Sequence, residues 1–171
     1  MSQENVMRKL KVAKITLNIG AGTDTQKLKN GQKLLKHITG VEPVTTKTQK
    51  RIQGWGLRPG LPVGCKVTLR GKKAEAMLKN LLSAKEKNLR ESQFDDFGNL
   101  SFGIPEYIDI KDVKYLPEVG VMGLEVAVTL ERPGYSVKRR RYQPVQVGKK
   151  HQVRKDEAID FMKSEYGVNI E

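Results

Sequence analysis

Residues 65–71, CKVTLRG, alternate apolar and polar side chains, and this alternation decides the fold. A period of two is typical of a β-strand that buries one face and leaves the other face polar. The apolar positions are Cys65, Val67 and Leu69, and the polar positions are Lys66, Thr68 and Arg70. We therefore expect a strand whose outward face carries a hydroxyl group and two cations.

Two further segments show the same alternation. Residues 10–20, LKVAKITLNIG, place Lys14, Thr16 and Asn18 on the polar face, and residues 124–132, LEVAVTLER, alternate in the same way. Strands that are polar on one face are typical of an antiparallel sheet that is covered on one side only. Such a sheet needs helices to cover its apolar face.

Three segments carry apolar residues at the three- and four-residue spacing of an amphipathic helix. They span residues 24–39, 72–90 and 155–167. A further short strand is expected at 104–110, IPEYIDI. The predicted fold is α+β, an antiparallel sheet with helices packed on one face and with the other face polar. A length of 171 residues suits a single domain, residues 1–171.

The charge of the chain points to a polyanionic partner. The formal net charge is +13, and it is unevenly distributed. Residues 43–74 contain eight Lys or Arg and no acid, and residues 132–155 contain nine and no acid. Residues 86–125 contain nine acids and four bases, so this segment is either simply exposed or meets a different partner. The alternative, an ordinary basic surface, does not account for two long windows without one acid.

The polar sheet face is the first candidate site, and we expect it to face RNA. Hydroxyls, an amide and cations on a rigid sheet can donate hydrogen bonds to the ribose and phosphate groups of an RNA minor groove. The alternative is a sheet face that only contacts water. The candidate rRNA-binding residues of this face and its flank are Lys14, Thr16, Asn18, Lys47, Lys66, Thr68 and Arg70.

The second candidate is the glycine-rich basic segment at about 47–64, which is expected to be a mobile loop or a loosely paired ribbon. Its four glycines and two prolines surround Trp55, the only tryptophan. An aromatic tip on a cationic loop can stack on a base while arginine holds phosphate. The alternative is that Trp55 plugs the core. The candidate contact residues are Lys50, Arg51, Trp55 and Arg58.

The third candidate is the basic excursion at about 132–155. It lies between a predicted strand and a predicted helix, so both ends are anchored, which argues against a flexible basic tail. Anchored basic loops bind RNA phosphates without reading the base sequence. The candidate residues are Arg139, Arg140, Arg141, Lys149 and Lys150.

An enzyme has little support in this sequence. Gly20–Asp24 imitates the opening of a dinucleotide site, but Thr25 stands where the third glycine belongs. No nucleophile and base are paired, so no catalytic residue is expected. The single Cys65 cannot form an internal disulfide and has no partner at zinc-ligand spacing, so neither metal nor cofactor is expected. The sequence shows no signal peptide and no apolar run of the ~18 residues that cross a bilayer.

Several motifs resemble the universal large-subunit ribosomal protein number five, the "L-five" family, in its archaeal and eukaryotic form. The resemblance runs nearly from end to end. The motifs are KITLNIGAG (14–22), PVGCKVTLRG (62–71), FGIPEYIDI (102–110), ERPGYSVKRRR (131–141) and GKKHQVRKDEAIDFM (148–162).

The resemblance implies a non-catalytic structural component of the large ribosomal subunit in the cytoplasm. This family binds 5S rRNA in the central protuberance, and Asn18, Thr68 and Arg70 lie in the strands that touch it. The loop matching residues 50–62 reaches the elbow of the peptidyl-site tRNA. The expected partners also include large-subunit rRNA, neighbouring ribosomal proteins and a small-subunit head protein at an intersubunit bridge. The alternatives are a nucleotide-binding enzyme using Gly20–Asp24 and a general basic RNA chaperone.

Overall fold

Strand β1 (Lys11–Gly20) forms the centre of a five-stranded sheet in the computed structural model, which describes residues 5–111 and 113–170. Its neighbours are β3 (Pro62–Leu69) and β6 (Leu124–Glu131). The edges are β2 (Val44–Lys47), beside β3, and β5 (Asn99–Ile104), beside β6. Each neighbouring pair is antiparallel. The sheet is therefore antiparallel throughout, as the alternation predicts.

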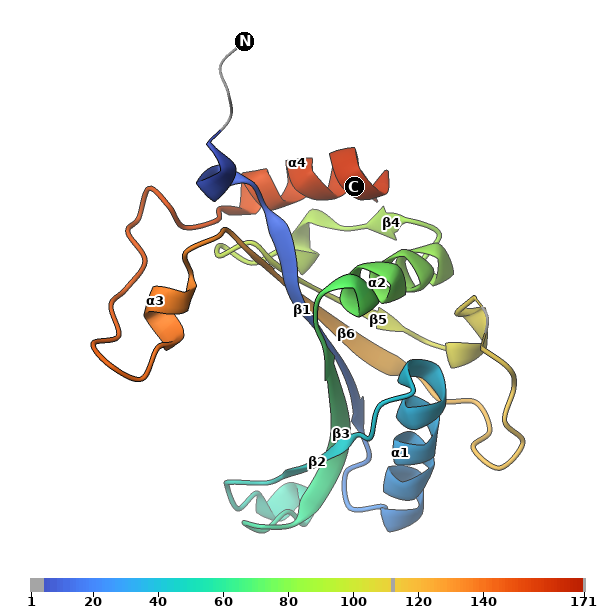
Figure 1. Ribbon diagram of the computed structural model, residues 1–171. Coiled ribbons are helices and arrows are strands. Elements are labelled where there is room, and N and C mark those ends of the chain that lie inside the picture. Colours follow the sequence, from blue (N-terminus) through green and yellow to red (C-terminus); the bar gives the residue numbers. More distant parts are fainter. Residues whose placement is uncertain (1–4, 112, 171) are drawn as a thin grey trace.

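Helices α1 (Thr25–Thr39) and α2 (Lys72–Ala84) cover one face of this sheet, and α4 (Lys155–Tyr166) lies across one end (Figure 1). The inward side chains of the strands and helices form one core. Its fully buried members include Ile15, Leu17, Leu34, Leu35, Leu78, Leu81 and Leu82. The α+β class and the one-sided helical cover are confirmed.

The remaining elements are short. They are the 3₁₀ turns η1 (Val6–Arg8), η2 (Gln53–Trp55), η3 (Glu91–Gln93) and η4 (Tyr107–Asp109), the one-turn helix α3 (Ser136–Arg139), and the strands β4 (Asn88–Leu89) and β7 (Asn169–Ile170). Strands β4 and β7 pair in parallel. This pairing holds the segment that follows α2 beside the C-terminal segment.

The predicted helix 72–90 is longer than the helix that the structure contains. It ends at Ala84 because the chain turns back through Glu86 and Lys87, whose φ angles are 54° and 58°. Left-handed backbone at two successive residues with side chains is uncommon. No glycine marks this turn, so the sequence carries no stop signal.

The predicted strand at 104–110 is wrong. Strand β5 ends at Ile104, and Pro105 has no amide hydrogen to continue the ladder. The chain folds inward instead, through η4. The buried Tyr107 accepts a hydrogen bond at its hydroxyl from the backbone amide of Leu116, at 2.9 Å. The alternating letters of this segment thus describe a packed connection rather than a strand.

Gly98 offers a test of the packing between the β5 turn and α4. Its φ is 73°, and a Cβ there would lie 2.5 Å from Cγ1 of Val153. Gly98→Ala is expected to lower the free energy of unfolding by about 3 kcal/mol, from left-handed strain plus overpacking. In the control Gly22→Ala, φ is 62° but no atom lies within 4 Å, so strain alone should cost about 1 kcal/mol. Urea denaturation measures both, and equal losses would contradict a contribution from Val153.

Candidate nucleic-acid interface

The sheet face opposite α1 and α2 is not covered by these helices and carries the predicted polar side chains (Figure 1). The apolar residues that alternate with these positions, Ile15, Leu17, Ile19, Cys65, Val67 and Leu69, are buried, so the polar residues face outward. Asn18 lies opposite Lys66, and Thr16 lies opposite Thr68. Arg70 follows the end of β3 and is exposed. Lys14, Thr16, Asn18, Lys66 and Thr68 therefore share one face, the open face.

The open face also carries acids that the sequence analysis did not place there. The β1–β6 register sets Glu125 opposite Asn18, and the Asn18 side-chain amide donates to Glu125 at 3.0 Å. Farther along β6, Glu131 accepts from the Arg139 guanidinium at 2.6 Å. The alternation within residues 124–132 already turns these acids outward, but only the strand register shows which residues they meet. The open face is therefore a hydrogen-bonding surface of mixed charge.

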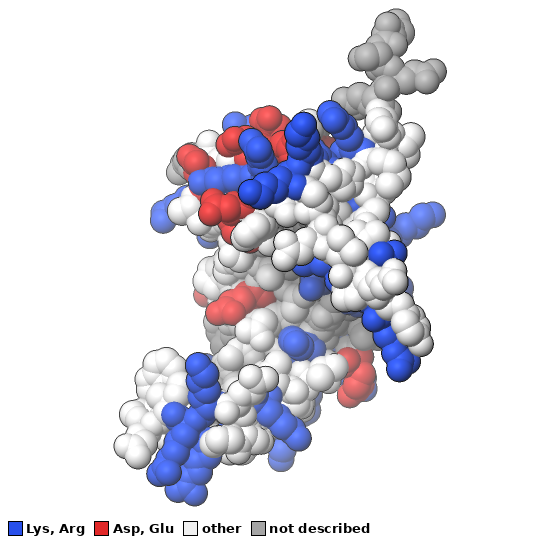
Figure 2. Space-filling model, turned by 90° about the vertical axis from the view of Figure 1, so that its left-hand side faces the viewer, with Lys and Arg blue, Asp and Glu red and all other residues white. Residues whose placement is uncertain are grey.

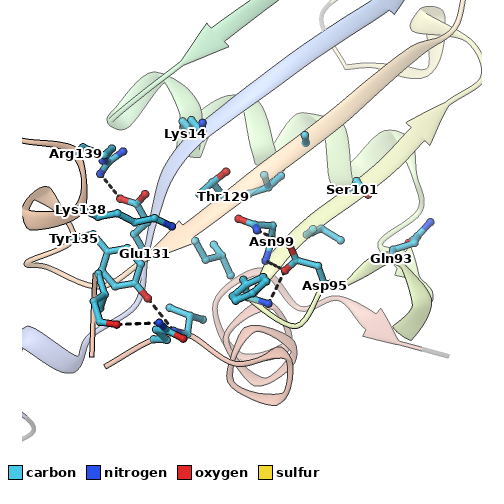
Figure 3. A pocket seen from close by; sticks show the side chains of 18 of the residues that line it. Lys14, Gln93, Asp95, Asn99, Ser101, Thr129, Glu131, Tyr135, Lys138 and Arg139 are labelled. Carbon is cyan, nitrogen blue, oxygen red and sulfur yellow. Dashed lines mark hydrogen bonds and ion pairs between the residues drawn. The ribbon is translucent and has the colours of Figure 1, made fainter. Parts of the chain in front are cut away.

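A groove of about 690 Å³ lies between the open face and the basic excursion. Figure 3 shows Lys14, Lys138 and Arg139 on one side of it, Asn99 and Ser101 on the other, and Thr129 between them. Ser101 and Thr129 come from β5 and β6, and neither residue is among the candidates predicted from the sequence. Each wall also carries a carboxylate: Glu131 lies beside Arg139, and Asp95 accepts from the Asn99 side chain at 2.6 Å. The groove therefore offers cations and neutral hydrogen-bonding groups, which can contact a sugar–phosphate strand, together with two acids that already have partners.

The segment after β2 is a paired ribbon rather than an open loop. The amide of Thr48 donates to the carbonyl of Leu61, and Ile52 and Leu57 exchange two bonds of 3.0 Å. Trp55 stands at the tip with 71% of its surface exposed, so it does not plug the core. The four cations of this segment, Lys47, Lys50, Arg51 and Arg58, are exposed.

The basic excursion is anchored at its base by an arginine that the sequence analysis counted among its surface cations. Arg132 is only 8% exposed, and its guanidinium lies 2.7 Å from the carboxylate of Glu157 on α4. It also donates to the backbone carbonyl of Arg8 at 3.1 Å. Arg132 is therefore a structural residue. The predicted phosphate-binding cations Arg139, Arg140, Arg141, Lys149 and Lys150 are exposed.

The ribbon and the excursion project on the same side as the open face, so that the three together enclose a concave surface (Figure 1). Figure 2 looks onto this side, and Lys and Arg gather on the projecting parts around a hollowed centre with fewer charges. We call this surface the concave face. Its rim is cationic, and its floor is the open face of the sheet.

The nucleotide-binding interpretation of Gly20–Asp24 is contradicted by the fold. A dinucleotide site needs a parallel βαβ unit, whereas β1 is antiparallel to both of its neighbours. The carboxylate of Asp24 also accepts bonds from the amides of Gln26 and Lys27, at 2.8 and 3.1 Å. It thereby occupies the helix N-terminus where a phosphate would bind.

Two classes of site are not found in the described ranges. Within residues 5–111 and 113–170, no three His, Cys, Asp or Glu side chains lie close enough to hold a metal ion. No helix in these ranges is long and apolar enough to cross a membrane. Burial raises the pKa of Cys65 to about 11, so its thiol is not primed as a nucleophile.

Arg132→Met tests the anchor of the excursion. Methionine keeps much of the side-chain volume but leaves Glu157 and two backbone carbonyls without their donor. The free energy of unfolding is expected to fall by about 2 kcal/mol, with faster amide exchange in residues 132–155. The exposed Arg58→Met is the control and should change stability by less than about 0.5 kcal/mol. Unchanged exchange in the excursion would show that Arg132 does not anchor it.

Comparisons with known proteins match almost the whole chain. The family model described as Ribosomal protein L5 matches residues 5–58, and the model of the C-terminus of the same ribosomal family matches residues 62–161. The chain is 51% identical over 168 residues to the large ribosomal subunit protein uL5 of Nanoarchaeum equitans, covering 98% of this chain and 99% of that protein. It is 46% identical to the protein of the same name from Sulfurisphaera tokodaii, over 97% of this chain and 94% of that one. The protein of this name from Nitrosopumilus maritimus is 41% identical, over 99% of both chains.

Proposed function

The chain belongs to the ribosomal protein L5 family, and from this premise we propose that its concave face docks 5S rRNA. It is a non-enzymatic structural constituent of the large ribosomal subunit, so rRNA and neighbouring ribosomal proteins are its partners. The observation that carries the proposal is a hydrogen-bonding sheet face enclosed by two exposed cationic projections. The sheet face and the pair of projections have different roles in the proposed RNA binding.

The floor of the concave face supplies directed hydrogen bonds. Thr16 and Thr68 lie directly opposite each other on β1 and β3 and bring two hydroxyl groups to the same part of the face. Such a rigid, flat array fits the wide minor groove of an RNA helix, where 2′-hydroxyls and base edges are accessible. Glu125 holds the Asn18 amide in one orientation before RNA arrives. The floor therefore sets the register of the RNA.

The rim supplies attraction that does not depend on base sequence. Exposed arginines and lysines on the ribbon and excursion replace the counterions of the phosphates, which makes binding strongly dependent on salt. A general basic RNA chaperone would use the rim alone. Competition by unrelated RNA at fixed salt separates the two functions, because only a protein that also reads shape prefers 5S rRNA.

Thr68→Val and Arg70→Ala test the floor and its border. Thr68→Val keeps the shape and removes the hydroxyl, so 5S rRNA affinity is expected to fall about fivefold. Arg70→Ala is expected to weaken binding about tenfold and to reduce the slope of log affinity against log salt by about 1. A filter-binding titration of the 5S transcript measures both, with circular dichroism to check folding.

Lys29→Ala is the matched control, because Lys29 is exposed on α1 and lies on the covered side of the sheet. It should leave affinity nearly unchanged. If Thr68→Val and Arg70→Ala both bind 5S rRNA as the wild type does, the assignment of the sheet face is wrong.

We further propose that the ribbon contacts the elbow of the peptidyl-site tRNA through residues 50–62. Trp55 and Ile52 expose apolar surface at its tip, and Arg51 and Arg58 flank them. An exposed aromatic ring among cations is suited to stacking on a base or sugar while the cations hold phosphates. A ribbon that contacted only water would gain nothing from exposing a tryptophan and an isoleucine at its tip.

Trp55 reports on its own contact because it is the only tryptophan. Titration with tRNA is expected to quench its fluorescence. Trp55→Ala should weaken tRNA binding about tenfold without changing affinity for 5S rRNA, and Trp55→Phe should retain most of the binding. Emission that is unaffected by saturating tRNA would remove the ribbon from the tRNA contact.

We propose the acidic segment between β5 and β6 as the site of the intersubunit contact. It exposes Ile108, Tyr115 and Val121 together with Glu106, Asp109, Lys111 and Lys114. Acids outnumber lysines in this segment, so its charge favours a basic protein segment over phosphate. The carboxylate of Glu118 in the same segment is already paired with Lys33 at 2.6 Å, and this hydrogen bond lowers its pKa. We propose this segment as the surface for the small-subunit head protein.

A further inference from the structure

We propose that the tip of the basic excursion, residues 140–144, is a base-stacking site in which Tyr142 packs on an unpaired base of the bound RNA. The inference rests on the proposed docking of 5S rRNA and names a contact that the electrostatic rim alone does not require. The ligand is the π-face of a nucleobase that has left its own stack.

The exposure of Tyr142 is the first observation. Its side chain is 78% exposed, more than any other large hydrophobic side chain within the described ranges. It lies in the window of residues 132–155, which contains no acid. A phosphate-binding loop has no need of an aromatic ring, whereas stacking on a base needs one.

The second observation is that the tip is a closed turn and not a loose coil. The Arg140 guanidinium donates to the backbone carbonyl of Gln143 at 2.9 Å. The amide of Val145 donates to the carbonyl of Val137 at 3.1 Å and ties the far side of the tip to α3. Tyr142 is therefore presented on a loop whose shape is fixed by its own hydrogen bonds.

The backbone at the tip is strained in a way that serves this presentation. Gln143 has a φ of 45°, in the left-handed region that residues with side chains enter at a free-energy cost. The strained residue directly follows Tyr142. Strained backbone that is held by surrounding bonds is found preferentially at binding sites.

A cation orients the ring from one side. The Arg141 guanidinium carbon lies 5.7 Å from the centre of the Tyr142 ring, within range of a cation–π contact. The opposite side of the ring is then the side on which a base can stack, because Tyr142 is 78% exposed.

The position of the tip favours RNA over a protein partner. The excursion projects on the side of the open face, toward the RNA proposed to lie there (Figure 1). The exposed apolar groups of the acidic segment, by contrast, lie in a stretch of mixed charge in which acids outnumber lysines. The sequence around Tyr142 contains no acid, so it does not repel a polyanion. An RNA with unpaired bases is such a polyanion and also supplies a base for stacking.

A binding titration with the 5S transcript at fixed salt tests the proposal. Tyr142→Ala is expected to weaken binding about tenfold, and Tyr142→Phe and Tyr142→Trp to bind within about twofold of the wild type. The salt slope should stay unchanged in Tyr142→Ala, because no charge is lost. Tyr115→Ala is the matched control, since Tyr115 is also exposed but lies in the acidic segment, and it should not change affinity.

A set of transcripts with single abasic sites identifies the stacked base. One abasic position is expected to weaken the wild type by the same factor as Tyr142→Ala, and to have no further effect in Tyr142→Ala. If the wild type does not bind 5S rRNA, the proposed docking fails. If the wild type binds but Tyr142→Ala binds equally, or no abasic position is coupled to Tyr142, the docking stands and the stacking site is overturned.

Discussion

The burial of the inward side chains of β1 against β3 and β6 fixes the rest of this molecule. Ile15, Leu17 and Ile19 lie opposite Leu69, Val67 and Cys65, and all six are buried. A slip of one residue by either strand would turn the three inward side chains of that strand to the solvent and its outward residues into the core. The hydrophobic effect therefore holds the register, and the register holds the binding face. The position of Thr68 beside Thr16 is a consequence of packing on the other side of the sheet.

This coupling explains why so much of the sheet could be predicted from the sequence and where prediction stopped. Period-two alternation identifies β1, β3 and β6 because each strand buries one face and exposes the other to solvent. Residues 104–110 are also rich in apolar residues, but they do not form a strand. Pro105 cannot continue the ladder, and tertiary packing turns Tyr107 inward. The early end of α2 depends on left-handed backbone at Glu86 and Lys87. Neither residue type favours this conformation, so the sequence does not predict the turn.

The outward position of the polar residues on the open face was predicted, but the acids that they meet there were not. Alternation turns Glu125 and Glu131 outward, yet only the pairing of β6 with β1 brings Glu125 to Asn18. Counting charges in a window also cannot separate a cation that binds a partner from one that holds the fold. Arg132 and Arg139 are seven positions apart in the same acid-free window. One is buried against Glu157 and the other is exposed beside Glu131. The distinction requires burial, which depends on where α4 packs.

The carboxylates of the open face hold hydrogen-bond donors in place. Glu125 accepts from Asn18 and Glu131 accepts from Arg139, so each acid weakens nonspecific attraction to phosphate but fixes its donor in one orientation. A preoriented donor loses less conformational entropy when RNA arrives than a free one does. A fixed donor also binds only those RNA structures that place a hydrogen-bond acceptor opposite it. In the docking that we propose, the rim holds many RNAs weakly and the floor discriminates among them by geometry. The proposal thus separates affinity and specificity between two parts of one surface, and it predicts that salt acts mainly on the rim.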